Sequence, residues 1–168
     1  QLQAEGVDVR GVATDPTRLT ALVILGIRDK EHFPLIFYRE NCADMALEAD
    51  QIDPAFIAEA RAVLVTGTHL SKPNLAAASR RAMQLAHAGK ALTILDIDYR
   101  PVLWGIGGHG TGEVRFVDNA AVSAHLQSIL PDCDIVVGTE EEVHIAGGST
   151  DTLTALRAIR AKTAALIV

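Results

Sequence analysis

Short apolar runs alternate with longer amphipathic segments along most of this chain, and this alternation restricts the folds that it can adopt. The runs predicted to be strands are residues 62–65, 92–95, 134–137 and 164–168. The segments predicted to be helices are residues 73–88, 118–130 and 151–162. Strands that alternate with helices form a parallel sheet covered by helices. The pattern therefore predicts an α/β fold with a mostly parallel central sheet.

The segment before these repeats has the pattern of an antiparallel hairpin. Two apolar runs, residues 20–27 and 33–38, are separated by the short polar link 28–32. Asp53 and Pro54 then mark the start of a short helix, with Asp53 as its N-cap. An exposed hairpin offers a free edge, so we expect it either to pair with a second subunit, giving a homodimer, or to cover a substrate as a lid.

The two ends of the sequence indicate an incomplete domain. Residues 164–168 form an apolar run in which the sequence stops, and a complete domain seldom ends with an unpaired core strand. Residues 1–6 resemble the end of a helix running into a turn. We therefore expect residues 1–168 to form a single domain that is truncated at both ends.

The composition argues against several classes of protein. Of the 168 residues, 49% are hydrophobic and 21% are charged, as in a globular domain with a core. The net charge of −6 and the lack of a basic run argue against a nucleic-acid partner, and no apolar stretch is long enough to span a membrane. Cys42 and Cys133 match no metal spacing and are expected to be free buried thiols, which indicates a cytoplasmic protein.

Polar residues follow three of the predicted strands, in segments 66–68, 96–100 and 138–142. The carboxyl ends of parallel strands lie at the same edge of a sheet, where ligands bind, so we expect these segments to form a site. Segment 96–100 supplies two carboxylates and Arg100, which could bind a planar carboxylate or phosphate with two hydrogen bonds. The alternative is a turn in which Asp96 caps the next turn and Arg100 pairs with an acid.

Two further segments each allow a structural and a functional interpretation. Thr139 and Glu142 fit a capping box at a helix start, which leaves Glu141 available to bind Mg²⁺. The same helix start favours a nearby phosphate. Arg39 follows the second hairpin strand and could bind an anionic substrate. Its alternative is an ion pair with one of two neighbouring acids, Glu40 or Asp44.

Residues 105–110 match the letters G-x-G-x-x-G but do not lie between a strand and a helix, as a dinucleotide fingerprint does. We interpret them as a Gly-rich connection to a short β run at 113–117, so a dinucleotide-dependent oxidoreductase has no other support. Trp104 is expected to pack beneath this loop.

No P-loop motif occurs. The histidines, which show no metal-ligand spacing, are His32, His69, His87, His109, His125 and His144.

The strand-end motifs resemble those of one enzyme family. DIDYRP, residues 96–101, resembles the D-x-N-x-R motif of ribokinase-type sugar kinases, the PfkB family. GTEEE, residues 138–142, is similar to the family's N-x-x-E motif, with Glu141 at the glutamate position. Asp98 and Gly138 each stand where the family usually has asparagine. Segments that resemble more closely the members acting in inositol catabolism are residues 37–47, 91–105 and 136–148.

The resemblance implies a ribokinase-like three-layer sandwich and an ATP-dependent, Mg²⁺-dependent kinase that phosphorylates a hydroxyl of a sugar acid. The implied substrate is 5-dehydro-2-deoxygluconate, and 2-keto-3-deoxygluconate or another sugar is the alternative. The implied substrate-binding residues are Arg39, Asn41, Asp98 and Arg100. Asp96 and Thr139 would lie on the phosphate and nucleotide side, and Glu141 would bind Mg²⁺, directly or through water.

The catalytic base of that family lies in a G-A-G-D segment that would follow Val168. The resemblance therefore places no catalytic residue in this chain, and the 168 residues alone are expected to be inactive. A non-catalytic ligand-binding α/β domain is the alternative from another functional class.

Overall fold

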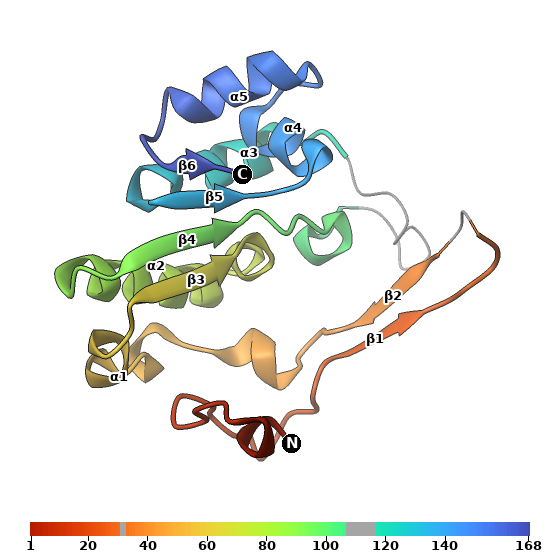
Figure 1. Ribbon diagram of the computed structural model, residues 1–168. Coiled ribbons are helices and arrows are strands. Elements are labelled where there is room, and N and C mark those ends of the chain that lie inside the picture. The colour runs from red at the N-terminus through yellow and green to blue at the C-terminus, as the bar shows by residue number, and fades with distance from the viewer. Residues whose placement is uncertain (31–32, 107–116) are drawn as a thin grey trace.

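A computed structural model describes residues 1–30, 33–106 and 117–168 (Figure 1). Its strands are β1 (Leu22–Leu25), β2 (Leu35–Tyr38), β3 (Ala62–Thr66), β4 (Leu92–Asp96), β5 (Ile135–Val137) and β6 (Leu166–Ile167). Its α-helices are α1 (Pro54–Ala58), α2 (Pro73–Ala88), α3 (Ala120–Gln127), α4 (Glu140–Gly147) and α5 (Thr152–Arg160). Strands and helices alternate from β3 onward, which confirms the predicted α/β class.

The central sheet consists of four parallel strands in the order β3-β4-β5-β6. Leu64, Ile94, Ile135 and Leu166 are paired with one another in a row across it. The spatial order of the strands follows the chain, and right-handed crossovers that step in one direction put their helices on the same face. In Figure 1, α2 and α3 accordingly lie behind the strands.

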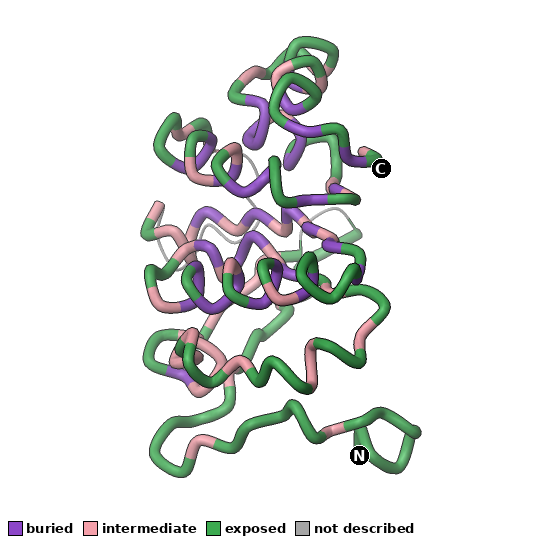
Figure 2. Tube along the Cα trace, turned by 90° about the vertical axis from the view of Figure 1, so that its left-hand side faces the viewer, coloured by how far each residue is buried: buried purple, intermediate pink, exposed green. Residues whose placement is uncertain are grey.

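The face of the sheet covered by these helices holds the hydrophobic core. Leu95 and Val136 are fully buried there, against Met83 of α2 and Leu126 of α3. Alternate residues of the strands point to the other face, where Leu64 remains 57% exposed. Figure 2 shows the buried residues concentrated in the sheet and its helices, whereas the first 30 residues are mostly exposed.

The predicted hairpin is present as a separate sheet of two antiparallel strands, β1 and β2. Its register pairs Leu22 with Tyr38 and Leu25 with Leu35. All of β1 is exposed although every residue in it is apolar. The strands are shorter than the predicted runs, and two residues of the link, 31 and 32, lie outside the described residues.

Side-chain caps set several helix starts. Asp53 accepts a hydrogen bond from the Ala55 amide at 2.8 Å, as predicted for α1. Asn119 caps α3, which ends at Gln127, before the predicted boundary, because a 3₁₀ turn containing Pro131 follows it.

Two expectations from composition can be compared with the described residues. Within them, no helix is both long and apolar enough to cross a membrane. Cys42 and Cys133 are free and buried, as predicted, and burial raises the pKa of the Cys133 thiol to about 12.

Candidate functional site

The three polar segments predicted to converge do meet at one edge of the central sheet. Thr66 pairs with Asp96, and Asp96 with Val137, so β3, β4 and β5 end side by side. The amide of Ile97 continues the pairing by donating to the Val137 carbonyl at 2.9 Å. We call segments 66–68, 96–100 and 138–142 the strand-end site.

Ile97 is packed between two glycines in the strand-end site. A Cβ atom on Gly67 would lie 2.0 Å from the carbonyl oxygen of Ile97, and one on Gly138 would lie 2.8 Å from the Ile97 Cδ1 atom. The backbones after β3 and β4 therefore approach more closely than a side chain at position 67 would allow. At position 138 the nearest atom belongs to the side chain of Ile97.

Asp98 links two of the segments through its carboxylate. Its φ of 32° is positive, a conformation that aspartate and asparagine tolerate better than most residues. Oδ2 accepts a hydrogen bond from the Thr68 hydroxyl at 2.7 Å, and Oδ1 pairs with Arg100 Nη2 at 3.0 Å. The unusual backbone of Asp98 is thus held from both sides.

Glu142 ties the remaining segment to this network. It completes the predicted capping box of α4 by accepting the Thr139 amide on Oε2 at 2.9 Å. Its Oε1 accepts the Tyr99 amide and Arg100 Nη1, both at 3.1 Å. Sequence reasoning gave Glu142 only the cap. The structure adds that its carboxylate joins α4 to the end of β4. Arg100 pairs with two acids, Asp98 and Glu142, which agrees with the alternative interpretation of Arg100 as an ion-paired residue.

The other predicted residues of the strand-end site differ in burial. Burial, followed by the negative charges of Asp98 and Glu142, raises the pKa of Asp96. Thr139 and Glu141 are exposed at the start of α4. Within the described part of the chain, no cluster of three or more His, Cys, Asp or Glu residues could hold a metal.

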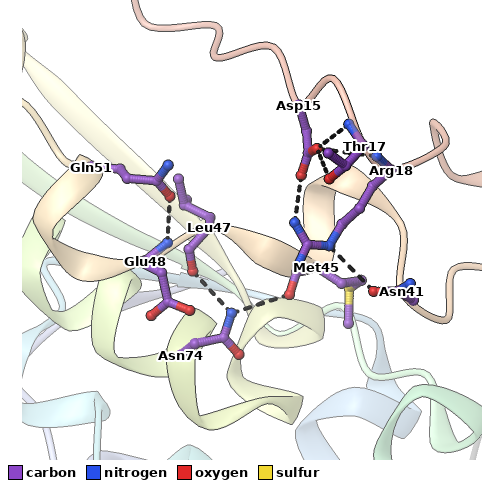
Figure 3. A network of polar contacts seen from close by, with 9 residues as sticks. All are labelled: Asp15, Thr17, Arg18, Asn41, Met45, Leu47, Glu48, Gln51 and Asn74. Atoms are coloured by element: carbon purple, nitrogen blue, oxygen red, sulfur yellow. Dashed lines mark hydrogen bonds and ion pairs between the residues drawn. The ribbon is translucent and has the colours of Figure 1, made fainter.

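Arg39 lies away from the strand ends, where β2 leaves the hairpin. Its guanidinium pairs with Asp44 through Nε at 2.9 Å and through Nη2. Of the two acids considered as partners, the structure selects Asp44. Asn41 follows with a φ of 52° and accepts a hydrogen bond from Arg18, which Asp15 holds in turn (Figure 3).

A cleft of about 250 Å³ opens beside Arg39, and we call it the hairpin cleft. Its lining residues are Phe37, Arg39, Glu40, Asn41, Met45, Lys72, Val102, Leu103 and Gly105. Burial, and next the charge of Arg39, lower the pKa of His69, on which Asp44 and Asp98 also act. His69 therefore lies within electrostatic range of charged groups from both places.

The predicted site residues thus fall into two groups. Asp96, Asp98, Arg100 and Thr139 meet at the strand ends, with Glu141 exposed beside them. Arg39 and Asn41 line the hairpin cleft. Lys72 also lines the cleft and was missed, because no motif in the sequence relates the start of α2 to the hairpin.

Two further predictions concern the loop after Arg100. Trp104 packs against the core and contacts His125 edge-on, with ring centroids 5.5 Å apart, as expected of a packing residue. Most of the G-x-G-x-x-G match lies outside the described residues, and so does nearly all of the short β run expected at 113–117.

The sequence is similar to curated proteins of known name. It is 31% identical over 170 residues to 5-dehydro-2-deoxygluconokinase of Photobacterium profundum, covering 98% of this chain and 48% of that protein. The enzyme of the same name from Geobacillus kaustophilus is 30% identical over 142 residues, with coverages of 84% and 39%. No family model matches the chain. The chain spans about half the length, or less, of these relatives.

Solved structures agree with this resemblance. A PfkB protein from Polaromonas sp. JS666 superposes with a TM-score of 0.80 at 24% identity, covering 99% of this chain and 53% of that one. A fructokinase from Xylella fastidiosa with bound ATP gives 0.76 at 21% identity, with coverages of 95% and 47%. The chain therefore has the ribokinase-like fold, and the resemblance to PfkB-type sugar kinases, and to 5-dehydro-2-deoxygluconokinase among them, is confirmed.

Proposed function

We propose that this chain is the central part of an ATP-dependent kinase that phosphorylates a hydroxyl of a sugar acid, with 5-dehydro-2-deoxygluconate as the substrate. The observation that carries this proposal is the hairpin cleft. It has the size of a small metabolite, is lined by Arg39 and Asn41, and is bordered by the turn that follows Arg100 of the strand-end site. An arginine in such a cleft favours an acid over a neutral sugar.

In this proposal the two groups of residues have different tasks. Arg39 and Asn41 bind the substrate in the hairpin cleft. Asp98 and Arg100 complete the site from the strand ends, where their ion pair fixes the loop that forms one wall of the cleft. Phosphoryl transfer depends mainly on positioning and on compensating phosphate charge, so a rigid wall beside an open cleft suits that reaction.

The phosphate side is proposed at the start of α4. Exposed backbone amides at a helix start attract phosphate oxygens, and Thr139 and Asp96 border this place. Mg²⁺ keeps several waters and takes few protein ligands in such enzymes. The exposed carboxylate of Glu141 fits that role, directly or through water, and the lack of a larger cluster among the described residues is compatible with it. When bound, Mg²⁺ would compensate phosphate charge.

The test is an ADP-release assay on the full-length polypeptide that carries this sequence. With Mg-ATP, we expect turnover of 5-dehydro-2-deoxygluconate at a kcat/KM at least about tenfold above that for 2-keto-3-deoxygluconate. The reverse preference would retain the kinase and replace the substrate. A folded protein that is silent with both acids and with simple sugars would favour the non-catalytic alternative.

The proposal also covers the 168 residues in isolation. Because the resemblance assigns the catalytic base to a segment after Val168, we propose that this chain alone does not turn over ATP with any sugar acid. ATP-dependent turnover by the purified 168-residue polypeptide would contradict it.

The hairpin is the proposed contact of a homodimer. Every residue of β1 is apolar and exposed, and β1 is an edge strand of its two-stranded sheet in the described structure. Pairing with the hairpin of a second copy would cover both features. Light scattering should give the mass of a dimer, and Val23→Lys, in the middle of β1, should shift it towards the monomer. An unchanged mass would reject this contact.

A further inference from the structure

Lys72 is a cation of the hairpin cleft that no motif predicted. It lines the cleft with Arg39 and Asn41 and is exposed. Its side chain makes no hydrogen bond or ion pair to any residue in the described ranges, whereas Arg39 is paired with Asp44. Lys72 is therefore a cation of the cleft lining that makes no direct contact with an acidic residue in the described part of the chain.

The start of α2 is held firmly against the wall of the cleft. Asn74, two residues after Lys72, donates from Nδ2 to the carbonyl oxygens of Met45 and Leu47, at 3.1 Å each (Figure 3). Pro73 occupies the first helical position and restricts the backbone there. Met45 itself lines the cleft. The backbone that carries Lys72 is thus fixed relative to the segment that follows Arg39.

The rest of the lining agrees with a small organic anion as the ligand. Phe37, Val102 and Leu103 supply apolar surface for a carbon skeleton. Arg100 is not among the lining residues, and its guanidinium is engaged with Asp98 and Glu142. Among the described residues, the lining contains one acid, Glu40, and two cations, Arg39 and Lys72.

We infer that Lys72 is a specificity-determining residue that, with Arg39, binds the carboxylate of the acidic substrate in the hairpin cleft. This inference rests on the proposed function. It assigns discrimination between acid and neutral sugar to two residues from separate parts of the chain. An ammonium on a flexible side chain can follow the carboxylate of a small ligand that Arg39 holds from the other side.

The test compares Lys72→Gln and Lys72→Arg in the full-length protein. With 5-dehydro-2-deoxygluconate, Lys72→Gln should raise KM by about 10- to 50-fold with kcat changed less than about threefold, because a hydrogen bond to a charged group is lost. The KM for ATP should not change, and Lys72→Arg should restore most of the affinity. Arg81→Gln, which removes an exposed cation from the same helix, is the matched control and should behave as wild type.

Calorimetric titration separates this inference from the proposed function. The probes are 5-dehydro-2-deoxygluconate and its carboxamide, which lacks the negative charge. If wild type binds the acid without phosphorylating it, and Lys72→Gln weakens binding of the acid alone, the kinase proposal fails and the role of Lys72 stands. An unchanged KM and Kd in Lys72→Gln, or equal weakening for acid and carboxamide, would overturn the inference, as would a folded wild type that does not bind the acid.

Discussion

Two arginines of this molecule differ in the number of acids that hold them. Arg100, in the strand-end site, contacts Asp98, Glu142 and the Tyr99 carbonyl within 3.1 Å. Arg39 pairs with one acid, Asp44, and faces the hairpin cleft. Both residues follow a strand in the sequence, and both were expected to bind substrate.

The difference shows how the partners of a cation decide its task. Two acids compensate the charge of Arg100 and a carbonyl takes a further hydrogen bond, so this residue holds a loop in place. Arg39 keeps an open cavity beside it and can exchange water for a ligand carboxylate. If the strand-end site is framework and the hairpin cleft is the binding surface, substitutions in the first should lower stability and substitutions in the second should weaken substrate binding.

The largest effect is expected at Gly67. In Gly67→Ala, the new Cβ would meet the Ile97 carbonyl oxygen at 2.0 Å, so the strand ends must separate. We expect the free energy of unfolding, measured with urea, to fall by about 3 kcal/mol or more. Gly89→Ala is the control, because the nearest atom would be at an ordinary 3.5 Å. Similar losses in both variants would mean that close approach is not what Gly67 provides.

Two adjacent glutamates should respond differently. Glu142→Gln weakens the pairing with Arg100, and we expect a loss of about 2 kcal/mol in the free energy of unfolding. Glu141→Gln changes an exposed side chain, so stability should change by less than about 0.5 kcal/mol. Its effect should appear instead as a roughly tenfold weaker apparent affinity for Mg²⁺ in the kinase assay. Equal loss of stability in the two variants would contradict the assignment of Glu142 to the framework and of Glu141 to Mg²⁺ binding.

The two arginines can be compared directly by the same substitution. Arg39→Gln should raise the KM for the sugar acid about 10- to 50-fold and leave the free energy of unfolding within about 1 kcal/mol. Arg100→Gln should lower that free energy by about 1–2 kcal/mol, because it leaves the carboxylate of Glu142 without its cation. If Arg100→Gln raised KM as much as Arg39→Gln without loss of stability, Arg100 would belong to the binding surface.

The smallest effect concerns Asp96 and depends on pH. Its pKa is raised, so the folded state favours the protonated carboxyl, and this contribution to stability is lost as pH rises through the folded-state pKa. Asp96→Asn should therefore stabilise the fold slightly at pH 7.5, by less than about 1 kcal/mol, and less at pH 4. Urea midpoints at both pH values measure this, with Asp50→Asn as an exposed control. A larger stabilisation by Asp96→Asn at pH 4 than at pH 7.5 would contradict the raised pKa of Asp96.

The architecture could be predicted because each element has a local cause. Strands β3 to β5 are apolar runs, Asp53 and Thr139 are caps, and the shared edge of a parallel sheet brings the strand ends together. The partners of side chains could not be predicted in the same way. Arg39 had two candidate acids, one and five residues after it, and only the path of the chain after β2 selects Asp44.

The hairpin cleft was not predictable for a related reason. Its lining comes from β2 and the segment after it, the start of α2, and the turn after Arg100. These segments have no common motif, and their meeting depends on contacts such as those that Asn74 makes to two carbonyl oxygens. Lys72 is therefore visible as a site residue only in three dimensions.

The positive φ of Asp98 has a consequence for how such a site can diverge. Aspartate and asparagine are the two non-glycine residues of nearly equal shape that accept this backbone, and either can receive the hydrogen bond of Thr68. Exchanging one for the other alters charge while leaving the loop in place. With aspartate, two carboxylates pair with Arg100, and with the asparagine usual in PfkB-type kinases Glu142 alone would compensate its charge. Such an exchange at one turn would thus reset the local charge while the path of the backbone is kept.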